Sequence, residues 1–246
     1  MDPSLYPRMA EVEDAHWWFA ARRAICDHLL DRLALPPDAA ILEPGCGTGG
    51  NFPMLARRGR VFAMDSDESA LRFAASRKLA ELARGSLPDN IPFGDRLFDL
   101  ALMTDVLEHL DDPLGSLRAV HARLKPGGWL LLTVPALPWL WSEHDLTHHH
   151  RCRYRAGELR ATVAGAGFNV SYLSHYNFIL FPAIACARLW GKLMRGGATS
   201  ANGRHDLTMP PMPLNQILLR LFSSEHYVIG RLHVPVGVSL IALARA

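Results

Sequence analysis

The sequence predicts an α/β protein built on a mostly parallel sheet with helices on both faces. Apolar segments of strand length alternate with amphipathic segments of helical spacing through the first half of the chain. These strand-length segments are almost continuously apolar, which is typical of parallel strands buried on both faces. A glycine-rich loop follows the first of them, at the edge where such sheets bind ligands.

Length and composition indicate one domain over 1–246. Apolar residues make up 49% of the chain and charged residues 20%, an ordinary globular balance. Within it we expect an N-terminal helical cap over 1–35, a cofactor-binding half over 36–135 and a substrate-side half over 136–246. An insertion at about 177–235 should separate the last two strands.

Charge and cysteine usage limit the partners and the compartment. The net charge of +2 argues against a nucleic-acid-binding surface. The four cysteines form no C-x-x-C pair, which indicates free thiols in a reducing compartment. The first residues lack the basic and apolar regions of a signal peptide, and no run of about 20 apolar residues is present. We therefore expect a cytoplasmic protein.

An aromatic cluster precedes the first expected helix. Residues His16, Trp17, Trp18 and Phe19 come just before a segment of helical spacing at 24–33. The aromatic side chains either anchor this helix to the body of the protein or form a flap over the glycine loop, and both roles are compatible.

The glycine loop lies between a strand and a helix. Residues 41–44 read as a strand, and residues 51–55 can open a helix. Gly45 and Gly47 let the backbone turn sharply or approach a ligand without a Cβ in the way. The unpaired N–H groups at the start of the helix face the loop. Such a loop is typical of a site for a nucleoside-bearing cofactor.

Two carboxylates bear on which cofactor binds. The glycines also satisfy the dinucleotide pattern G-x-G-x-x-G, so they do not decide by themselves. Glu43, directly before the loop, would repel a pyrophosphate and suits a ligand with a cationic amine. Asp65 ends the next expected strand, at 61–65, where it can accept hydrogen bonds from both ribose hydroxyls of either cofactor.

Further elements bring more polar residues to the same edge of the sheet. We expect a helix over 69–82 with Ser66 or Asp67 as its N-cap, a strand over 98–104, a helix opened by Asp112 and a strand over 129–134. A turn-rich loop at 85–89 precedes the strand over 98–104. The carboxyl ends then carry Asp65, Ser86, Leu87, Thr104 and Asp105, which one bound molecule can touch.

Taken together, these motifs resemble the class I S-adenosylmethionine-dependent methyltransferases. The resemblance covers most of the chain and rests on four ordered motifs: Glu43-x-Gly45-x-Gly47-x-Gly49, Asp65, Phe98-Asp99 with Asp105-Val106-Leu107-Glu108-His109, and Lys125-Pro126-Gly127-Gly128. It implies a Rossmann-like sheet of seven strands with the last one antiparallel, closed by segments 168–173 and 238–243. His16-Trp17-Trp18-Phe19 and segment 144–154 are similar to one bacterial subgroup of this family.

The resemblance also implies a cofactor pocket for S-adenosylmethionine. Gly45 and Gly47 would approach the methionine part, Asp65 the ribose, and Ser86 and Leu87 the adenine; many relatives carry Asp in place of Ser86. The full set of expected cofactor contacts is Trp17, Glu43, Gly45, Cys46, Gly47, Asp65, Ser66, Ser86, Leu87, Thr104 and Asp105.

A histidine-rich segment at 139–154 follows the strand expected over 129–134 and so lies on the cofactor side of the sheet. Three consecutive histidines cannot all point one way, and the spacing matches no standard ligand set, so no metal is expected. We expect a substrate-facing loop in which His150 or His144 accepts a proton, with Tyr154 as a third catalytic candidate. A polar loop held only by hydrogen bonds is the open alternative. Glu108 and His109 are expected to have capping or core-facing structural roles.

The most apolar run is 178–187, followed by Arg188, Lys192 and Arg195. Segment 177–195 either lies in a membrane interface as a peripheral contact or covers the sheet edge or the pocket. If it is helical, its cations share one face, which can meet anionic headgroups while Phe178, Phe181 and Ile184 enter the acyl boundary.

The sequence thus predicts methyl transfer from S-adenosylmethionine to a small-molecule or lipid-linked acceptor. Two alternatives remain open at this point. One is a nicotinamide-dependent oxidoreductase that uses the same glycine loop, and the other is a non-catalytic cofactor-binding subunit of a partner enzyme.

Overall fold

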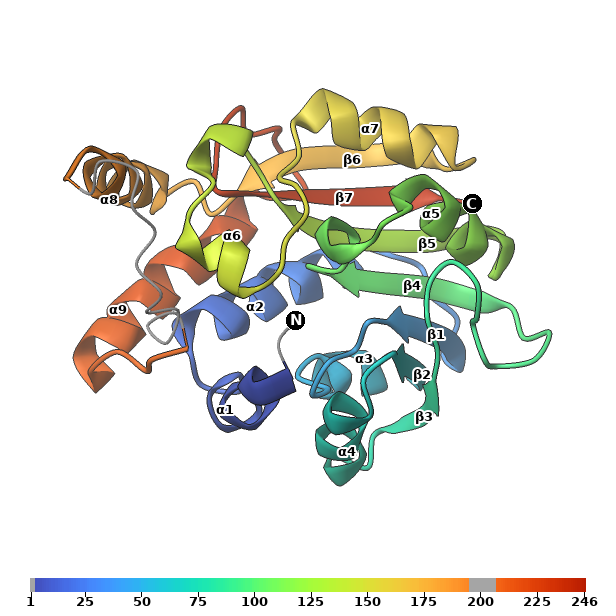
Figure 1. The fold of residues 1–246 in the computed structure, drawn as a ribbon. Coiled ribbons are helices and arrows are strands. Elements are labelled where there is room, and N and C mark those ends of the chain that lie inside the picture. The colour runs from blue at the N-terminus through green and yellow to red at the C-terminus, as the bar shows by residue number, and fades with distance from the viewer. Residues whose placement is uncertain (1–2, 195–206) are drawn as a thin grey trace.

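The computed structural model describes the backbone of residues 3–194 and 207–246, and their side chains except at 3, 144 and 192–194. Over these residues the chain forms one seven-stranded sheet in the order β3-β2-β1-β4-β5-β7-β6 (Figure 1). The strands are β1 Ala39–Pro44, β2 Gly59–Asp65, β3 Ala80–Arg84, β4 Phe98–Thr104, β5 Leu124–Pro135, β6 Asn169–Tyr176 and β7 Ser239–Arg245.

Strand directions agree with the predicted architecture. Strands β1 to β5 pair in parallel, whereas β7 runs antiparallel to both β5 and β6. The expected closing segments 168–173 and 238–243 fall on β6 and β7. The prediction of a mostly parallel seven-stranded sheet is therefore confirmed.

Helices cover both faces of the sheet. They are α1 Tyr6–Val12, α2 Trp17–Leu30, α3 Phe52–Ala56, α4 Glu68–Ser76, α5 Pro113–Ala122, α6 Glu143–Thr147, α7 Ala156–Gly165, α8 Phe181–Met194 and α9 Met212–Ser223, with short 3-10 turns η1 Pro3–Leu5, η2 Leu107–His109, η3 Pro138–Leu140 and η4 Ser224–Tyr227. No helix among the described residues is long and apolar enough to cross a membrane.

Two apolar cores result, one on each face. Successive strand residues point to opposite faces, so Ile41 joins the core under α2, α3, α4 and α9, while Leu42 joins the core under α5 and α7. Sandwiching the sheet in this way explains why its central strands are apolar at nearly every position.

The predicted helix over 69–82 is wrong in its second half. Helix α4 ends at Ser76, Lys78 adopts a positive φ of 55°, and residues 80–84 form the edge strand β3 beside β2. This strand is short and half-exposed, and its Ala, Glu and Leu residues favour helix locally, so only pairing with β2 makes it a strand. Asp67 is the N-cap, as expected, and accepts from the N–H groups of Ser69 and Ala70.

The N-terminal helix begins earlier than predicted. His16 is the N-cap of α2, its ring accepting from the N–H of Trp18, so the aromatic cluster opens the helix. The N–H of Trp17 donates to Asn215 Oδ1 at 2.9 Å, and the ring of Trp18 contacts that of Phe222 in a tilted arrangement with centroids 5.3 Å apart, which ties α2 to α9. The insertion between β6 and β7 therefore packs against the N-terminal segment.

Candidate active site

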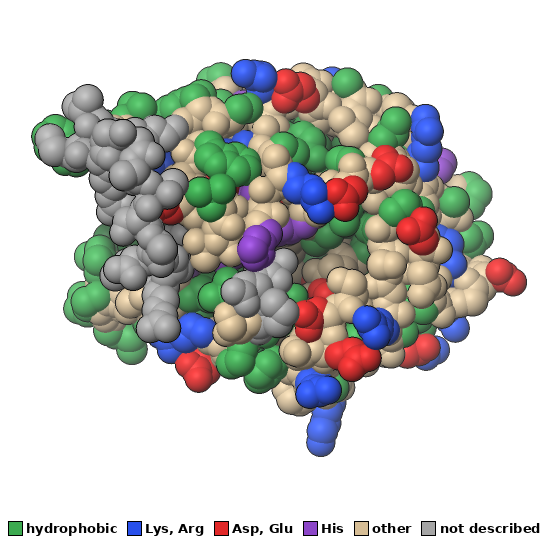
Figure 2. Space-filling model, viewed as in Figure 1, with side chains coloured by type: hydrophobic (Ala, Val, Ile, Leu, Met, Phe, Trp, Pro, Cys, Tyr) green, Lys and Arg blue, Asp and Glu red, His purple; other side chains and the backbone are tan. Residues whose placement is uncertain are grey.

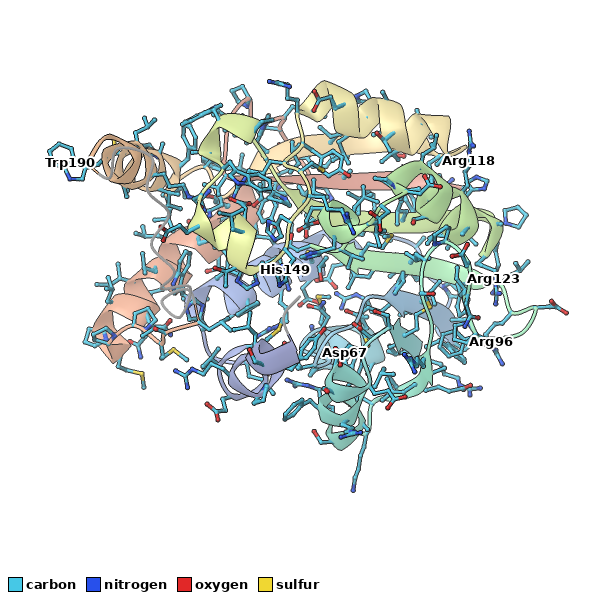
Figure 3. All side chains as sticks on the ribbon, in the orientation of Figure 1. Asp67, Arg96, Arg118, Arg123, His149 and Trp190 are labelled. Carbon is cyan, nitrogen blue, oxygen red and sulfur yellow. The ribbon has the colours of Figure 1, made fainter. Side chains whose placement is uncertain are left out.

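A cavity of about 600 Å³ opens at the carboxyl ends of the parallel strands. Most of its lining comes from the N-terminal segment, the glycine loop, the residues that follow β2, β3 and β4, the histidine segment and α8. Histidine side chains reach the surface near the middle of this face (Figure 2). Asp67, at the N-terminus of α4, and His149, from the histidine segment, both lie toward the centre of the same view (Figure 3).

The glycine loop is tied to β2 and shaped by the residues it touches. The N–H groups of Gly45 and Cys46 both donate to the carbonyl of Met64, at 2.8 and 3.0 Å. Gly45 has a φ of +73°, and a Cβ there would lie 2.8 Å from Val106. Only glycine fits this position, so the loop backbone itself forms part of the cavity wall.

Asp65 is held by backbone donors at the edge of the cavity. Its Oδ2 accepts from the N–H of Gly47 at 2.9 Å, and its Oδ1 accepts from the N–H of Asp67 at 3.0 Å. Burial raises the pKa of Asp65, while these backbone donors oppose the shift. Each oxygen retains acceptor capacity, as a contact to the two ribose hydroxyls requires.

Glu43 is buried at the end of β1 and only half satisfied. Its Oε1 accepts from Asn51 Nδ2 at 2.8 Å, and the same amide donates to Thr104 Oγ1 at 2.9 Å. Its Oε2 has no hydrogen-bond partner among the described residues. Burial raises the pKa of Glu43 to about 8, against the opposing effects of Asn51 and Arg22. A carboxylate in this setting fits a ligand with a cationic amine, such as the methionine part of S-adenosylmethionine.

Asp105 is fixed from two directions at the end of β4. It has a positive φ of 55°, forms an ion pair with Arg22 from α2, and accepts from Thr133 Oγ1 at 2.9 Å. Burial opposes ionisation of Asp105, but Arg22 and Thr133 outweigh it and hold the pKa below its usual value. Asp105 is therefore an anion that anchors α2 to the cavity.

The N-terminal segment forms another wall. Tyr6, Met9 and Glu13 line the cavity together with Trp17 and Trp18. Glu13 is buried, and its Oε1 accepts from Thr48 Oγ1 at 2.5 Å and from Arg77 Nη2 at 2.7 Å. These bonds hold the N-terminal segment against the glycine loop. Both roles considered for the aromatic cluster are thus present, because Trp18 packs on Phe222 as well as facing the cavity.

The histidine segment centres on a buried carboxylate. Asp145 is fully buried and accepts from Ser142 N–H at 2.8 Å, from Arg153 Nε at 2.7 Å and from His150 Nδ1 at 2.9 Å. Burial opposes ionisation, but His150 and Arg153 hold the pKa of Asp145 far below its usual value. Asp145 accepts from Nδ1, and the other nitrogen of His150, Nε2, lies 4.0 Å from Glu108 Oε1.

The three catalytic candidates are placed differently. His150 lines the cavity, together with His148 and Arg153. Tyr154 is buried in the core, with its hydroxyl 3.5 Å from the carbonyl of Leu107, and is not among the described lining residues. Its predicted contact with substrate is not supported by this position. The side chain of His144 lies outside the described residues.

Glu108 and His109 lie beside His150 rather than in purely structural positions. They belong to the turn η2 and both line the cavity, a position that the expected capping or core-facing roles did not include. Glu108 is fully buried, and its Oε1 lies 4.0 Å from His150 Nε2. Burial and the nearby Asp105 raise the pKa of Glu108 well above its usual value. Burial and His150 lower the pKa of His109 to about 4.

Helix α8 covers the cavity with one face. Ile184, Ala187 and Arg188 line it, and Arg188 Nη1 donates to the carbonyl of Leu140 at 2.7 Å. The orientation expected for a membrane contact, with Arg188 at headgroups and Ile184 among acyl chains, is wrong because the helix turns both residues inward. Trp190 points away from the body (Figure 3) and is 64% exposed. Arg195 and the side chain of Lys192 lie outside the described residues.

Every residue expected to contact the cofactor lines this one cavity. The set is Trp17, Glu43, Gly45, Cys46, Gly47, Asp65, Ser66, Ser86, Leu87, Thr104 and Asp105. The sequence reasoning missed Tyr6, Met9, Glu13, Arg22, Asn51 and Arg188 among the lining residues. Arg22 is buried on the inner face of α2, and its partner Asp105 lies 83 residues away, so sequence spacing does not reveal the pair.

Comparison with known families identifies the fold and its chemistry. Residues 18–173, more than half of the chain, match a family model described as a methyltransferase domain. The chain belongs to this methyltransferase family.

Relatives support the same conclusion. A probable S-adenosylmethionine-dependent methyltransferase from Mycolicibacterium smegmatis is 27% identical over 177 residues, which cover 68% of this chain and 67% of the relative. The malonyl-[acyl-carrier protein] O-methyltransferase of Pseudescherichia vulneris is 27% identical over 222 residues, which cover 87% and 86%. The methyltransferase described here is thus similar to enzymes along most of its length, and it uses S-adenosylmethionine.

A solved structure shares the fold at low sequence identity. The [4+2]-cyclase SpnF superposes with a TM-score of 0.64 at 18% identity, covering 99% of this chain and 92% of SpnF. Because this fold carries more than one reaction, the residues of the cavity must decide which acceptor the methyltransferase uses.

Proposed function

We propose that this enzyme transfers a methyl group to an oxygen atom of a small-molecule or lipid-linked acceptor. The observation that carries the proposal is the Asp145–His150 pair on the wall of the cavity that also holds the glycine loop. A buried carboxylate that accepts from one imidazole nitrogen fixes the orientation of the ring, as a proton-transfer group requires. The O-methyltransferase name of the Pseudescherichia vulneris relative supports oxygen as the methylated atom.

In the cofactor half of the cavity, different residues are assigned to different parts of S-adenosylmethionine. In the proposal Glu43 binds the amino group of S-adenosylmethionine, and the backbone at Gly45, Cys46 and Gly47 lies along its methionine part. Asp65 and Ser66 take the ribose, and the adenine lies between Ser86 and Leu87. Thr104 and Asp105 complete the wall from β4. The unpartnered Oε2 of Glu43 supports this assignment, because a buried carboxylate oxygen gains most from a cationic donor.

The bound cofactor supplies a methyl group already activated by the sulfonium, so the residues of the chain mainly align and enclose the reactants. Trp17, Trp18 and the inner face of α8 exclude water from the cavity. Asp145 holds the ring of His150 so that Nε2 faces the acceptor, either to take its proton or to act through a bound cation. Transfer would join the acceptor oxygen to the methyl carbon, leave the electron pair of the broken carbon–sulfur bond on sulfur, and pass the acceptor proton to His150 or to solvent.

Further parts of the proposal concern the subgroup, the lid and the location. The cavity position of Trp17 and Trp18 supports membership of the bacterial subgroup with the His-Trp-Trp-Phe motif. The exposed Leu189 and Trp190 on the outer face of α8 support a peripheral contact with membrane lipid. We therefore place helix α8, which covers the cavity and is here called the lid helix, near a lipid surface. The free cysteines support a cytoplasmic location.

Transfer of a labelled methyl group by variants tests the catalytic part. His150→Gln should lower turnover about 100-fold or more, the usual range for a lost proton-transfer group, while leaving the affinity for S-adenosylhomocysteine nearly unchanged. The matched control is His149→Asn, because His149 is exposed, adjacent and has a positive φ that asparagine tolerates. His144→Gln tests the second candidate in the same assay. Full activity in both His150→Gln and His144→Gln would return the segment to a purely structural role.

A further inference from the structure

We propose that Glu108, His109 and His150 bind a divalent transition-metal cation at the wall of the cavity. One ligand atom from each residue, a carboxylate oxygen and two imidazole nitrogens, lies within 4.8 Å of the others. Glu108 and His109 are adjacent in η2, which follows β4, whereas His150 comes from the segment after β5. All three side chains line the cavity, so a bound cation would be accessible to an acceptor.

Glu108 is the main reason to expect a cation. Its side chain is fully buried, and neither carboxylate oxygen has a hydrogen-bond partner among the described residues. An ionised carboxylate is costly to bury without a partner, and a protonated one would leave the same two oxygens unsatisfied. A cation would satisfy an oxygen and balance the charge, which no described donor does.

The two imidazoles have suitable surroundings. Nδ1 of His109 is buried and has no hydrogen-bond partner among the described residues. His150 donates from Nδ1 to Asp145 at 2.9 Å, and its Nε2 lies 4.0 Å from Glu108 Oε1, on the side of the proposed site. Histidine residues that bind a metal through one ring nitrogen usually donate a hydrogen bond from the other nitrogen to a carboxylate or carbonyl oxygen. Asp145 would therefore be a positioning residue for the metal ligand.

The ligand set indicates which cation is bound. Two imidazoles and one carboxylate suit Zn²⁺ and its neighbours, whereas Mg²⁺ prefers oxygen ligands. Bonds of about 2.1 Å in a tetrahedral site place ligand atoms about 3.4 Å apart, so the three residues must close by roughly 1 Å on binding. Three protein ligands leave a fourth position open, as in catalytic zinc sites.

Because all three ligand residues line the cavity, an acceptor oxygen could occupy the fourth position. A cation there would hold an acceptor oxygen and increase its acidity, with the proton released to solvent. Nε2 of His150 then serves as a ligand rather than as the proton acceptor. This catalytic role rests on the proposed methyl transfer, whereas the binding of the cation itself does not.

Metal binding by the full chain tests the proposal without any turnover. Protein freed of metal with a chelator is titrated calorimetrically with ZnCl₂, MnCl₂ or MgCl₂, and the metal content after dialysis is measured by mass spectrometry. We expect one equivalent of Zn²⁺ and the affinity order Zn²⁺ over Mn²⁺ over Mg²⁺. Glu108→Gln and His109→Gln should lower zinc affinity by more than 100-fold, and Asp145→Asn by about 10- to 100-fold. The control His149→Asn should bind zinc as the wild type does.

Two outcomes would overturn the cation site: wild-type protein that binds no zinc at millimolar concentration, or Glu108→Gln and His109→Gln that both bind it as tightly as wild type. Titration of each variant with S-adenosylhomocysteine reports whether its fold is retained, and His109→Gln replaces Glu108→Gln if the latter does not fold. Binding of S-adenosylhomocysteine without zinc refutes the cation site alone. Zinc binding without S-adenosylhomocysteine binding counts against the methyl-transfer proposal instead.

Discussion

Glu43→Gln is the substitution whose effect follows most directly from the geometry of the cavity. Glu43 is buried, Asn51 occupies its Oε1, and Oε2 has no partner among the described residues. Glutamine keeps the contact with Asn51 but removes the negative charge. The amino group of the cofactor then loses a charge-assisted hydrogen bond worth about 1.5–3 kcal/mol, so above pH 8, where the wild-type carboxyl is ionised, affinity for S-adenosylhomocysteine should fall roughly 10- to 150-fold.

The same residue sets a pH dependence of cofactor binding. Burial raises the pKa of Glu43 to about 8, so the carboxyl is mostly protonated at pH 7 before the ligand binds. Because the cationic amine requires the ionised form, binding at pH 7 should release about 0.9 proton, and affinity should rise about tenfold per pH unit below 8. Above pH 8 this dependence should level off.

The raised pKa also affects the stability of the ligand-free protein. The folded state holds a proton on Glu43 up to about pH 8, whereas the unfolded chain loses it near the ordinary value of 4.5. Glu43 therefore lowers the free energy of unfolding as pH rises through this window. Glu43→Gln should remove that contribution and so flatten the decline.

Calorimetry in buffers of different ionisation enthalpy measures both affinity and proton release. The account requires that Glu43→Gln lose most of the proton release as well as affinity. Wild-type binding at pH 7 without proton release, or an unchanged affinity in Glu43→Gln, would refute the assignment of Glu43 to the amino group.

Two further predictions concern the ribose contact and the lid helix. Asp65→Ala should weaken binding of S-adenosylhomocysteine by about 1.5–3 kcal/mol, since the ribose hydroxyls lose a charged acceptor, and unchanged affinity by calorimetry would show that Asp65 does not face the ribose. Trp190→Ser should reduce co-sedimentation with anionic liposomes while leaving cofactor affinity intact, because Trp190 is 64% exposed on the outer face of α8, and wild-type protein that ignores such liposomes at low salt would contradict the membrane contact.

The central strands and the glycine loop were predictable because local patterns determine them. Strands β1, β2, β4 and β5 are apolar runs that the sequence shows directly. The glycines of the loop adopt positive φ angles, and glycine is the residue type that adopts them most readily, so their presence alone indicates a tight loop. Strand β3 was not predictable, because its residues favour helix and only the edge of β2 makes them a strand.

Tertiary contacts between distant residues were the other limit. The pairing of Arg22 with Asp105 joins residues 83 positions apart, and the approach of His150 to Glu108 likewise depends on how two loops meet above the sheet. The spacing of three consecutive histidines argued against a metal, whereas the fold brings one histidine of that segment close to Glu108 and His109 of η2, which sequence spacing does not show. Sequence spacing also predicted that the cations of α8 share one face of the helix. It did not show that this face turns Arg188 inward, toward the carbonyl of Leu140.

Product analysis with methyl-labelled S-adenosylmethionine tests the central claim most directly. Purified wild-type protein is incubated with labelled cofactor and matched acceptors that offer a hydroxyl, a carboxyl, an amine or a carbon nucleophile on the same apolar scaffold, and the product is analysed by mass spectrometry. The account predicts a labelled methyl group on oxygen, with one S-adenosylhomocysteine formed per methyl transferred and strongly reduced transfer by His150→Gln. A labelled methyl group on nitrogen or carbon, or oxygen transfer that His150→Gln leaves intact, would contradict it.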